Sequence, residues 1–277
     1  MLIDAHAHLD RYGAEIEDAL KEIRAEDIFT VSNSMDVPSY VRNVEIGEAC
    51  DLVLPLFGVH PWNAQEHANH LEKLEPFIGQ TPMIGEVGLD HFFVKDRSRY
   101  PDQRKVFEFF LAAAKKQNKI INLHTKGAEE DVLALLIDYA VERAIIHWYS
   151  GPLDTFQRLA DRGICFTVGA EVLYSEHISE VARAVPLNQL LTETDNPGGP
   201  RSFLGRPGTP LLIKDVVRRI AGLRGSSYDE VVHQTQQNFL RLIQDDQGLV
   251  ELHNRLVTRG IEGTQPDAPA AAEEPRP

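Results

Sequence analysis

Cysteines, long apolar runs and basic residues are all scarce in this chain. Only two of its 277 residues are cysteine. Cys50 and Cys165 lie far apart in sequence, which fits neither a disulfide framework nor a cysteine metal site, so we expect two reduced, buried thiols. No stretch approaches the roughly 18 apolar residues that a membrane helix needs. The sequence is already polar at Asp4 and His6, which leaves no room for a signal peptide and indicates a cytoplasmic protein.

The shortage of basic residues limits the possible partners. The chain has 28 Lys and Arg against 42 Asp and Glu, a net charge of −14. A general nucleic-acid binder would normally carry a basic stripe, so the composition disfavours that class. An enzyme that meets nucleic acid only at a metal-filled pocket remains compatible, because a bound divalent cation can reverse the local charge.

Several catalytic motifs are absent as well. The sequence contains no Gly-x-Gly-x-x-Gly turn after a strand, no glycine-rich phosphate loop, and no Ser-His-Asp or Cys-His set. These absences disfavour dinucleotide-dependent enzymes and hydrolases that use a side-chain nucleophile.

What the chain does have is a regular alternation of strands and helices. Short apolar runs occur at residues 2–7, 27–32, 52–59, 83–88, 119–123, 143–146, 164–168 and 190–194. Helical periodicity occurs between them at residues 14–26, 38–49, 64–78, 101–117, 129–141, 153–161 and 175–184. Eight such units predict an α/β fold of the TIM (β/α)8 barrel type, with an open doubly wound sheet as the alternative.

The remaining sequence completes the predicted domain organisation. Three further helices are predicted at residues 210–222, 228–243 and 248–258. Residues 263–277 are rich in Pro, Ala and Glu and predict a disordered tail. We therefore expect one barrel domain over residues 1–262.

Polar residues recur where the predicted strands end. In a regular first strand, Asp4, His6 and His8 would share one face, opposite Ile3 and Ala5. A His-x-His pair is weak evidence alone, but a barrel places its chemistry at the carboxyl ends of all its strands. The residues at those ends are His6, His8, Asn33, His60, Glu86, His124, His147, Glu171 and Asp195.

The types of these residues indicate metal binding. Imidazoles and carboxylates suit zinc, manganese, iron, cobalt or nickel, with magnesium favoured only if oxygen ligands dominate. The set exceeds what one tetrahedral ion needs and suits two divalent metal ions about 3.5–4 Å apart.

In these residues the chain resembles the TatD family of metal-dependent hydrolases, the TatD-type DNases of the amidohydrolase superfamily. The similar segments span most of residues 2–243 in the family's order. They are Asp4-Ala-His-Ala-His-Leu9, Gly58-Val-His-Pro61, Ile84-Gly-Glu-Val-Gly-Leu-Asp90, Asp102-Gln-Arg104, Asn122-Leu-His-Thr125, Ala128-Glu-Glu-Asp131, His147-Trp-Tyr-Ser-Gly151, Glu193-Thr-Asp-Asn-Pro197 and Gln237-Asn-Phe239.

The resemblance implies a barrel with one or two metals and a hydrolytic activity, commonly on DNA phosphodiesters. It makes His6, His8, Glu86 and Asp195 the ligands of one metal. The ligands of the second become Glu86, His124 and His147, with Glu86 bridging the two ions. His60 would be a rim residue that faces the substrate.

Four departures from the family pattern bear on substrate contacts. Lys126 stands where the family usually has arginine, and lysine lacks the bidentate fork of arginine. Asn196 replaces a frequent serine, and residues 205–210 lack the acidic residue of the corresponding family segment. The aromatic after Leu-Asp is displaced by His91.

The resulting hypothesis is that a metal-activated water attacks phosphorus or a carbonyl carbon. Asp195 would orient this water and accept its proton, with a helix N-cap as its alternative role. Glu86 would bridge the metals, and Asp4 would orient a histidine from one layer deeper.

The substrate contacts are open to alternatives. Lys126 and His60 would hold a phosphate, although a solvated lysine explains the former equally well. Trp62 would stack on a base or pack on the next helix. Arg201 and Arg206 would add positive charge over the site or lie in a solvated loop.

Three functions follow. The leading one is a TatD-type nuclease or other phosphoesterase that meets nucleic acid at its pocket only, with no membrane partner. The second is hydrolysis of an ester, lactone or amide on the same metals, including an aminoacyl ester on tRNA. The third is metal-dependent assembly or regulation without catalysis.

Overall fold

The computed structural model describes residues 1–262, so the tail predicted for residues 263–277 lies outside the described residues. Within that range the chain forms the eight parallel strands that the sequence predicts. They are β1 (Leu2–Ala7), β2 (Ile28–Asn33), β3 (Val53–Leu56), β4 (Ile84–Gly88), β5 (Ile121–His124), β6 (Ala144–Ile146), β7 (Cys165–Val168) and β8 (Leu190–Thr192).

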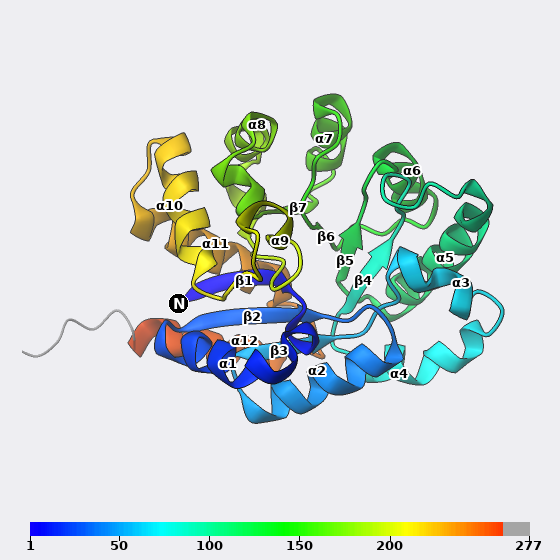
Figure 1. Cartoon of the computed structure of the whole chain (residues 1–277), viewed down its shortest axis with the longest axis horizontal. Coiled ribbons are helices and arrows are strands. Elements are labelled where there is room, and N and C mark those ends of the chain that lie inside the picture. Colours follow the sequence, from blue (N-terminus) through cyan, green and yellow to red (C-terminus); the bar gives the residue numbers. More distant parts are fainter. Residues whose placement is uncertain (263–277) are drawn as a thin grey trace, which may run out of the picture.

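The strands follow one another around a barrel in sequence order (Figure 1). Two ladders, β1-β2-β3 and β4-β5-β6-β7-β8, are joined by a parallel bridge between Phe57 and Ile84. At the other seam, Thr192 on β8 donates a side-chain hydrogen bond of 2.5 Å to the carbonyl of Ile3 on β1. The Asp4 carboxylate accepts hydrogen bonds there from the backbone N–H and the hydroxyl of Thr194. The TIM barrel prediction is therefore confirmed.

Helices cover the outside of the barrel (Figure 1). Most begin and end near the predicted residues, and two have a reciprocal capping box at their start, at Asp36 and Ser227. The helices with these bounds are α1 (Ile16–Ala25), α2 (Val37–Ala49), α5 (Tyr100–Gln117), α6 (Glu129–Asp138), α7 (Leu153–Ala160), α8 (Glu176–Ala184), α10 (Leu212–Arg224), α11 (Tyr228–Ile243) and α12 (Val250–Glu262).

One predicted helix is wrong. Residues 64–78 form not one helix but α3 (Ala64–His67), a 3-10 turn at Leu71–Leu74, and α4 (Glu75–Gln80). Pro76 lies in the first turn of α4, where its missing N–H costs nothing, whereas in a continuous helix it would remove a hydrogen bond. The loop after β8 also contains a short helix, α9 (Arg201–Leu204), that the sequence did not indicate.

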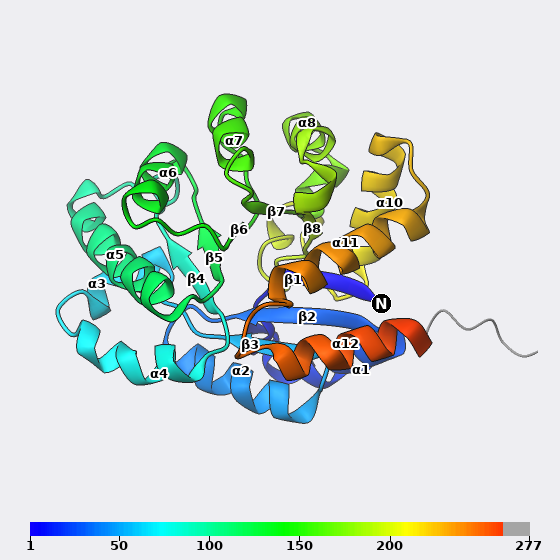
Figure 2. The same ribbon diagram turned by 180° about the vertical axis from the view of Figure 1, so that it is seen from behind.

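The barrel interior is apolar at its amino end. Side chains from six strands, together with Met83 and Ile120 just before β4 and β5, form one buried cluster there. It includes Ile3, Ala5, Phe29, Val31, Leu56, Met83, Ile120, Ile145, Cys165 and Leu191. Phe239 and Ile243 of α11, together with Leu249 and leucines of α12, join the same cluster. Figure 2 shows these two helices lying across the strands. The amino end is therefore closed by packing.

The predicted face of the first strand is also wrong. Ile3 and Ala5 lie in the interior cluster, while Asp4 binds Thr194 at the seam. The reason is a bulge: Asp4 pairs with Thr30 and Ala7 with Ser32, so β1 has one residue more than β2 between these pairs. This extra residue brings His6 to the interior although Ala5 already points there.

The cysteines and the helix compositions bear on two further predictions. Cys50 and Cys165 are both free and buried, as expected. No helix among residues 1–262 combines the length and the apolar content needed to cross a membrane.

Candidate metal centre

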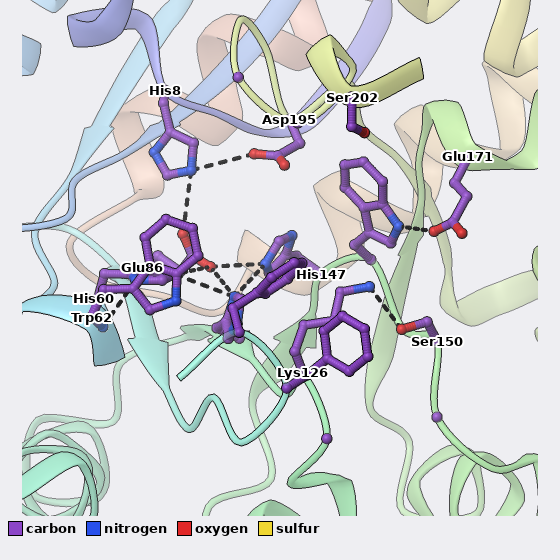
Figure 3. A pocket seen from close by; sticks show the side chains of 18 of the residues that line it. His8, His60, Trp62, Glu86, Lys126, His147, Ser150, Glu171, Asp195 and Ser202 are labelled. Carbon is purple, nitrogen blue, oxygen red and sulfur yellow. Dashed lines mark hydrogen bonds and ion pairs between the residues drawn. The ribbon is translucent and has the colours of Figure 1, made fainter. Parts of the chain in front are cut away.

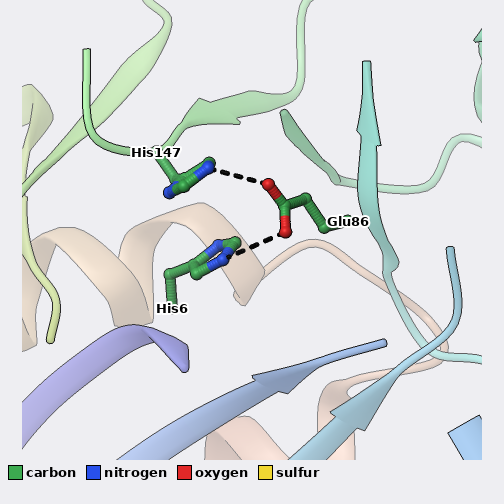
Figure 4. Close-up of side chains that lie close together, drawn as sticks. All are labelled: His6, Glu86 and His147. Atoms are coloured by element: carbon green, nitrogen blue, oxygen red, sulfur yellow. Dashed lines mark ion pairs between the residues drawn. The ribbon is translucent and has the colours of Figure 1, made fainter. Parts of the chain in front are cut away.

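Glu86 lies at the centre of a buried cluster at the carboxyl ends of the strands. Its Oε1 lies 2.8 Å from His124 Nδ1 and 2.8 Å from His147 Nε2. Its Oε2 lies 3.3 Å from His8 Nε2 and 3.5 Å from His6 Nε2. Figure 4 shows the carboxylate between His6 and His147, with one oxygen directed to each. The two oxygens therefore face two different sets of histidines.

Asp195 completes one of these sets. Its Oδ1 lies 3.3 Å from His8 Nε2 and 3.8 Å from His6 Nε2. The backbone brings it there directly, because the N–H of Asp195 donates to the carbonyl of His6 at 2.9 Å. Its side chain is 15% exposed against 1% for Glu86, so Asp195 is the cluster carboxylate that is open to the pocket.

The structure thus brings all six predicted ligands together. Three groups each have ligand atoms within 4.8 Å of one another: His6, Glu86 and His147; His6, His8 and Asp195; and His60, Glu86 and His124. A bulge on β4 places Glu86, because Ile84 pairs with Ile121 and Val87 with Leu123. A side chain at Gly85 would collide with Asn33 and Asn122, so this bulge requires glycine.

Three of the four predicted histidine ligands have their outer nitrogen held by an acceptor. His6 Nδ1 lies 3.0 Å from Asn122 Oδ1, and His8 Nδ1 lies 3.0 Å from the carbonyl of Asn33. His124 Nε2 lies 3.0 Å from Asp90 Oδ2. The exception is His147, whose Nδ1 has no hydrogen-bond partner among the described residues and lies 3.6 Å from Glu193 Oε2. The oxygen of Asn122 is fixed as the acceptor, because its amide nitrogen donates to the carbonyl of Ala5.

These partners determine which nitrogen of each ring is free to bind a cation. A hydrogen on the outer nitrogen leaves the lone pair of a neutral imidazole directed inward. The inward nitrogens meet in pairs, with His6 Nε2 at 3.3 Å from His8 Nε2 and His124 Nδ1 at 3.3 Å from His147 Nε2. Two lone pairs at this separation repel unless a cation or a proton lies between them. The donor set therefore fits divalent cations.

His60 differs from the other four histidines. Its Nδ1 accepts the backbone N–H of Trp62 at 3.2 Å, so the neutral ring carries its hydrogen on Nε2. That nitrogen lies 3.4 Å from Glu86 Oε1 and can donate to it. Burial lowers the pKa of His60 to about 4, which keeps the ring neutral. The side chain is buried beside Glu86 and lines the cavity, so it lies between the cluster and the space that a substrate would occupy.

The carboxylates and histidines of the cluster stabilise each other's charged forms and so shift each other's pKa values. Burial by itself would raise the pKa of Glu86, but the surrounding histidines hold it well below its usual value. Burial would lower the pKa of His147, but Glu86 and Glu193 raise it to about 10. Asp195 and Glu86 likewise raise the pKa of His8 well above its usual value despite burial. The two carboxylates thus require positive charge at the inward nitrogens.

The cluster opens into a cavity of about 900 Å³. Lys126 lines it, with its Nζ 2.7 Å from Ser150 Oγ and 5.3 Å from the centre of the Trp148 ring (Figure 3). Burial lowers the pKa of Lys126. Lys126 is therefore not a solvated surface lysine.

The other residues predicted near the site differ in whether they line the cavity. Trp62 lines the cavity and is 39% exposed, so it is not packed away under the next helix. Glu171 accepts a hydrogen bond from the indole N–H of Trp148 and does not reach the cluster (Figure 3). Arg201 and Arg206 are exposed and do not line the cavity, whereas Arg11, which the sequence did not single out, does.

The residues that orient the histidines were missed. Asp4 was expected in this role, but its carboxylate binds Thr194 instead. Asn122 performs it for His6 and Asp90 performs it for His124, and both are fully buried. The available signal was a polar residue within or beside an apolar strand run, since such a residue needs a buried partner.

Comparison with known proteins agrees with this geometry. Residues 3–244 match the family model described as TatD related DNase. The uncharacterized metal-dependent hydrolase YabD of Bacillus subtilis is 30% identical over 254 residues, which cover 87% of this chain and 98% of the relative. The uncharacterized metal-dependent hydrolase YcfH of Escherichia coli is 29% identical over 258 residues, which cover 88% and 96%.

A solved structure shows the same fold. The crystal structure of YJJV, a TatD homolog from Escherichia coli, superposes with a TM-score of 0.80 at 24% identity. The match covers 87% of this chain and 97% of that chain. Taken with the family model and the two relatives, the buried cluster of histidines and carboxylates leads to one conclusion: this chain belongs to the TatD-related DNase family of metal-dependent hydrolases.

Proposed function

We propose that residues 1–262 form one catalytic domain that cleaves phosphodiester bonds of nucleic acid with two divalent cations. One ion would be held by His6, His8, Asp195 and Glu86 Oε2, and the other by His124, His147 and Glu86 Oε1. The observation that carries this proposal is the division of the Glu86 oxygens between two sets of histidines. Ions bound there would make a water acidic enough to act as a nucleophile near neutral pH and would neutralise phosphoryl charge.

Asp195 is proposed as the base. Its Oδ1 faces His6 and His8, which leaves Oδ2 to orient the attacking water and accept its proton. Its greater exposure fits this role, because the base must reach both the ligand set and the substrate. Asp195 has a φ of 52°, in the left-handed region, which is unfavourable for residues other than glycine. Residues held in such conformations are common at functional sites.

His60 and Lys126 are proposed to bind the phosphoryl group. The neutral ring of His60 can donate its Nε2 hydrogen toward Glu86 or to a substrate oxygen beside it. Lys126 presents an ammonium group to the same cavity with Ser150 as its observed hydrogen-bond partner. The protein is strongly acidic elsewhere, so contact with nucleic acid would be confined to this cavity.

Ester, lactone or amide hydrolysis is the second candidate. It is favoured by Lys126, a single point charge that recognises phosphate less directionally than the arginine usual in the family. Such a reaction would use the same cluster and the same base.

One assay distinguishes the two candidates. The protein is stripped with EDTA, reloaded separately with Mg²⁺, Mn²⁺, Zn²⁺ or Co²⁺, and tested on single-stranded DNA, bis(4-nitrophenyl) phosphate and a 4-nitrophenyl ester. We expect turnover of both phosphodiesters that depends on the added ion. Ester turnover without phosphodiester turnover would contradict the nuclease proposal and support the second candidate. Asp10→Asn, a carboxylate outside the cavity, serves as the control variant.

A further inference from the structure

One wall of the cavity carries three exposed aromatic side chains. Trp62, Phe92 and Phe93 are 39%, 55% and 56% exposed, and all three line the cavity. Exposing several aromatic rings to water at one place is energetically unfavourable. A patch of this kind on a protein surface is therefore typical of a binding site. We propose that these residues bind an unpaired nucleobase of the substrate, next to the phosphate that is cleaved. The proposal rests on the proposed function and names a contact for the base.

The three rings form a corner rather than a flat patch. The Trp62 and Phe93 ring centres lie 5.9 Å apart with an angle of 80° between the planes. The Phe92 and Phe93 centres lie 4.9 Å apart at 88°. A flat ring placed in such a corner stacks on one face and meets another ring edge-on, and both arrangements are favourable for aromatic pairs.

The corner is held in place by Asp90. Its Oδ2 accepts the indole N–H of Trp62 at 2.7 Å, and its Oδ1 accepts the backbone N–H groups of Phe92 and Phe93 at 2.9 and 2.7 Å. The same carboxylate lies 3.0 Å from His124 Nε2. The aromatic surface is therefore already ordered, and a ligand loses less free energy in fixing it.

The separation between the aromatic corner and the ligand cluster suits the base and the phosphate of one nucleotide. The Trp62 ring contacts the His60 ring with 4.7 Å between centres, and His60 in turn faces Glu86. One side chain thus separates the aromatic surface from the ligand cluster. In a nucleotide the base and the phosphate are separated only by a sugar, so a single nucleotide matches this span.

The other aromatic rings of the cavity are less suitable because they are already in contact with neighbouring groups. The Lys126 ammonium lies over the Trp148 ring, and the Trp148 indole N–H binds Glu171. The Tyr174 ring packs on Phe203 with 4.3 Å between centres. On the proposed wall, Lys95 lies over Phe92 at 4.7 Å, which makes Phe93 and Trp62 the principal contacts.

This arrangement requires a base that is not paired. A base inside a duplex is stacked on both faces, so it must leave the stack before an aromatic side chain can contact its face. Stacking on aromatic side chains tolerates any base, because every base has a π-face. The corner would therefore recognise the presence of a base rather than its identity.

The test compares ligands with and without a base. Binding of deoxyadenosine monophosphate and of 2-deoxyribose 5-phosphate is measured by calorimetry on the full chain, with and without Mn²⁺. One stacked base corresponds to a preference of roughly 5- to 150-fold for the nucleotide. We expect Phe93→Ala to remove most of this preference, and Phe93→Tyr, which keeps the ring, to retain it. Tyr174→Ala, an exposed aromatic residue of the same cavity outside the corner, is the matched control and should leave the preference within about twofold.

Three results would overturn the proposal: no binding of the nucleotide, equal binding of the two ligands, or a preference that survives Phe93→Ala and disappears in Tyr174→Ala. Because Phe93 is more than half exposed, its substitution leaves no core cavity, and Phe93→Leu checks the same point with an apolar side chain. Turnover of bis(4-nitrophenyl) phosphate is measured in parallel. A base preference without turnover would contradict the proposed function alone, and turnover without a base preference would contradict the aromatic site alone.

Discussion

The two ends of the barrel are built from the same eight strands and differ in almost everything else. At the amino end, side chains such as Ile3, Phe29 and Leu191 pack with Phe239 and Ile243 of α11 in one buried apolar cluster. At the carboxyl end, the strands end in histidines and carboxylates that are buried, charged and hydrogen-bonded to each other. Burial of such groups is costly unless they are paired. Packing at the apolar end therefore supplies free energy of folding that offsets the cost of burying polar groups at the carboxyl end.

This comparison predicts that substitutions at the two ends affect different measurements. The largest effect on rate is expected for Asp195→Asn at the carboxyl end. Loss of a general base lowers turnover by about 10²- to 10⁴-fold, while the free energy of unfolding should change little. The measurement is kcat on bis(4-nitrophenyl) phosphate beside urea unfolding, with Asp10→Asn as control. Retention of more than about a tenth of the wild-type kcat would contradict the base role.

The largest effect on stability is expected for Phe239→Ala at the amino end. Phe239 is fully buried and lies 5.4 Å from Phe29 between ring centres. Its truncation leaves a cavity and should cost about 3–5 kcal/mol of unfolding free energy. Turnover of the folded protein should stay near the wild-type value. A loss of kcat comparable to that of Asp195→Asn would mean that the two ends are not independent.

A smaller effect is expected for Asn122→Ala, which removes the partner of His6. Loss of a group that orients a metal-bound histidine typically lowers metal affinity about 10- to 100-fold. Competition with a fluorescent zinc chelator measures this. Thr155→Ala removes a buried hydroxyl outside the barrel and should leave zinc affinity unchanged. Equal zinc affinity in Asn122→Ala and wild type would remove the proposed role of Asn122.

The smallest effect is expected from a change of one pH unit. Without a cation, Glu86 raises the pKa of His147 to about 10, so the ring is protonated at neutral pH. A cation must displace that proton, so metal affinity should rise with pH, by about tenfold per unit for each proton released. Affinities measured between pH 6 and 8 test the sign. An affinity that is constant or falls as pH rises would contradict the assignment of His147 as a ligand.

The contrast between the ends also explains which features the sequence could predict. Apolar periodicity reveals eight strands and most helices, because the amino end and the outer layer obey regular spacing. Histidines and carboxylates at strand ends reveal the cluster, because all parallel strands of a barrel place these ends on one rim. The resemblance to the TatD family added the order in which they occur.

The failures lie where spacing is irregular. A period of two places Asp4 on the same face as His6, but the extra residue in β1 reverses the faces after Ala5. A bulge on β4 does the same beside Glu86. Both bulges depend on how the strand pairs with its neighbour. The residues around each bulge do not by themselves indicate that pairing. Asn122 was missed for a related reason, since its contact with His6 joins residues 116 positions apart.

The most direct test of the account is the number of metal ions bound by the wild-type protein and by Glu86→Gln. Because the two oxygens of Glu86 face separate histidine sets, elemental analysis of the wild-type protein after metal loading and desalting should find two ions per chain. Glu86→Gln should lose at least one of them together with turnover, while its fold is retained by circular dichroism. A wild-type protein that binds no ion, or a Glu86→Gln protein that binds the full number and keeps its activity, would contradict the central claim.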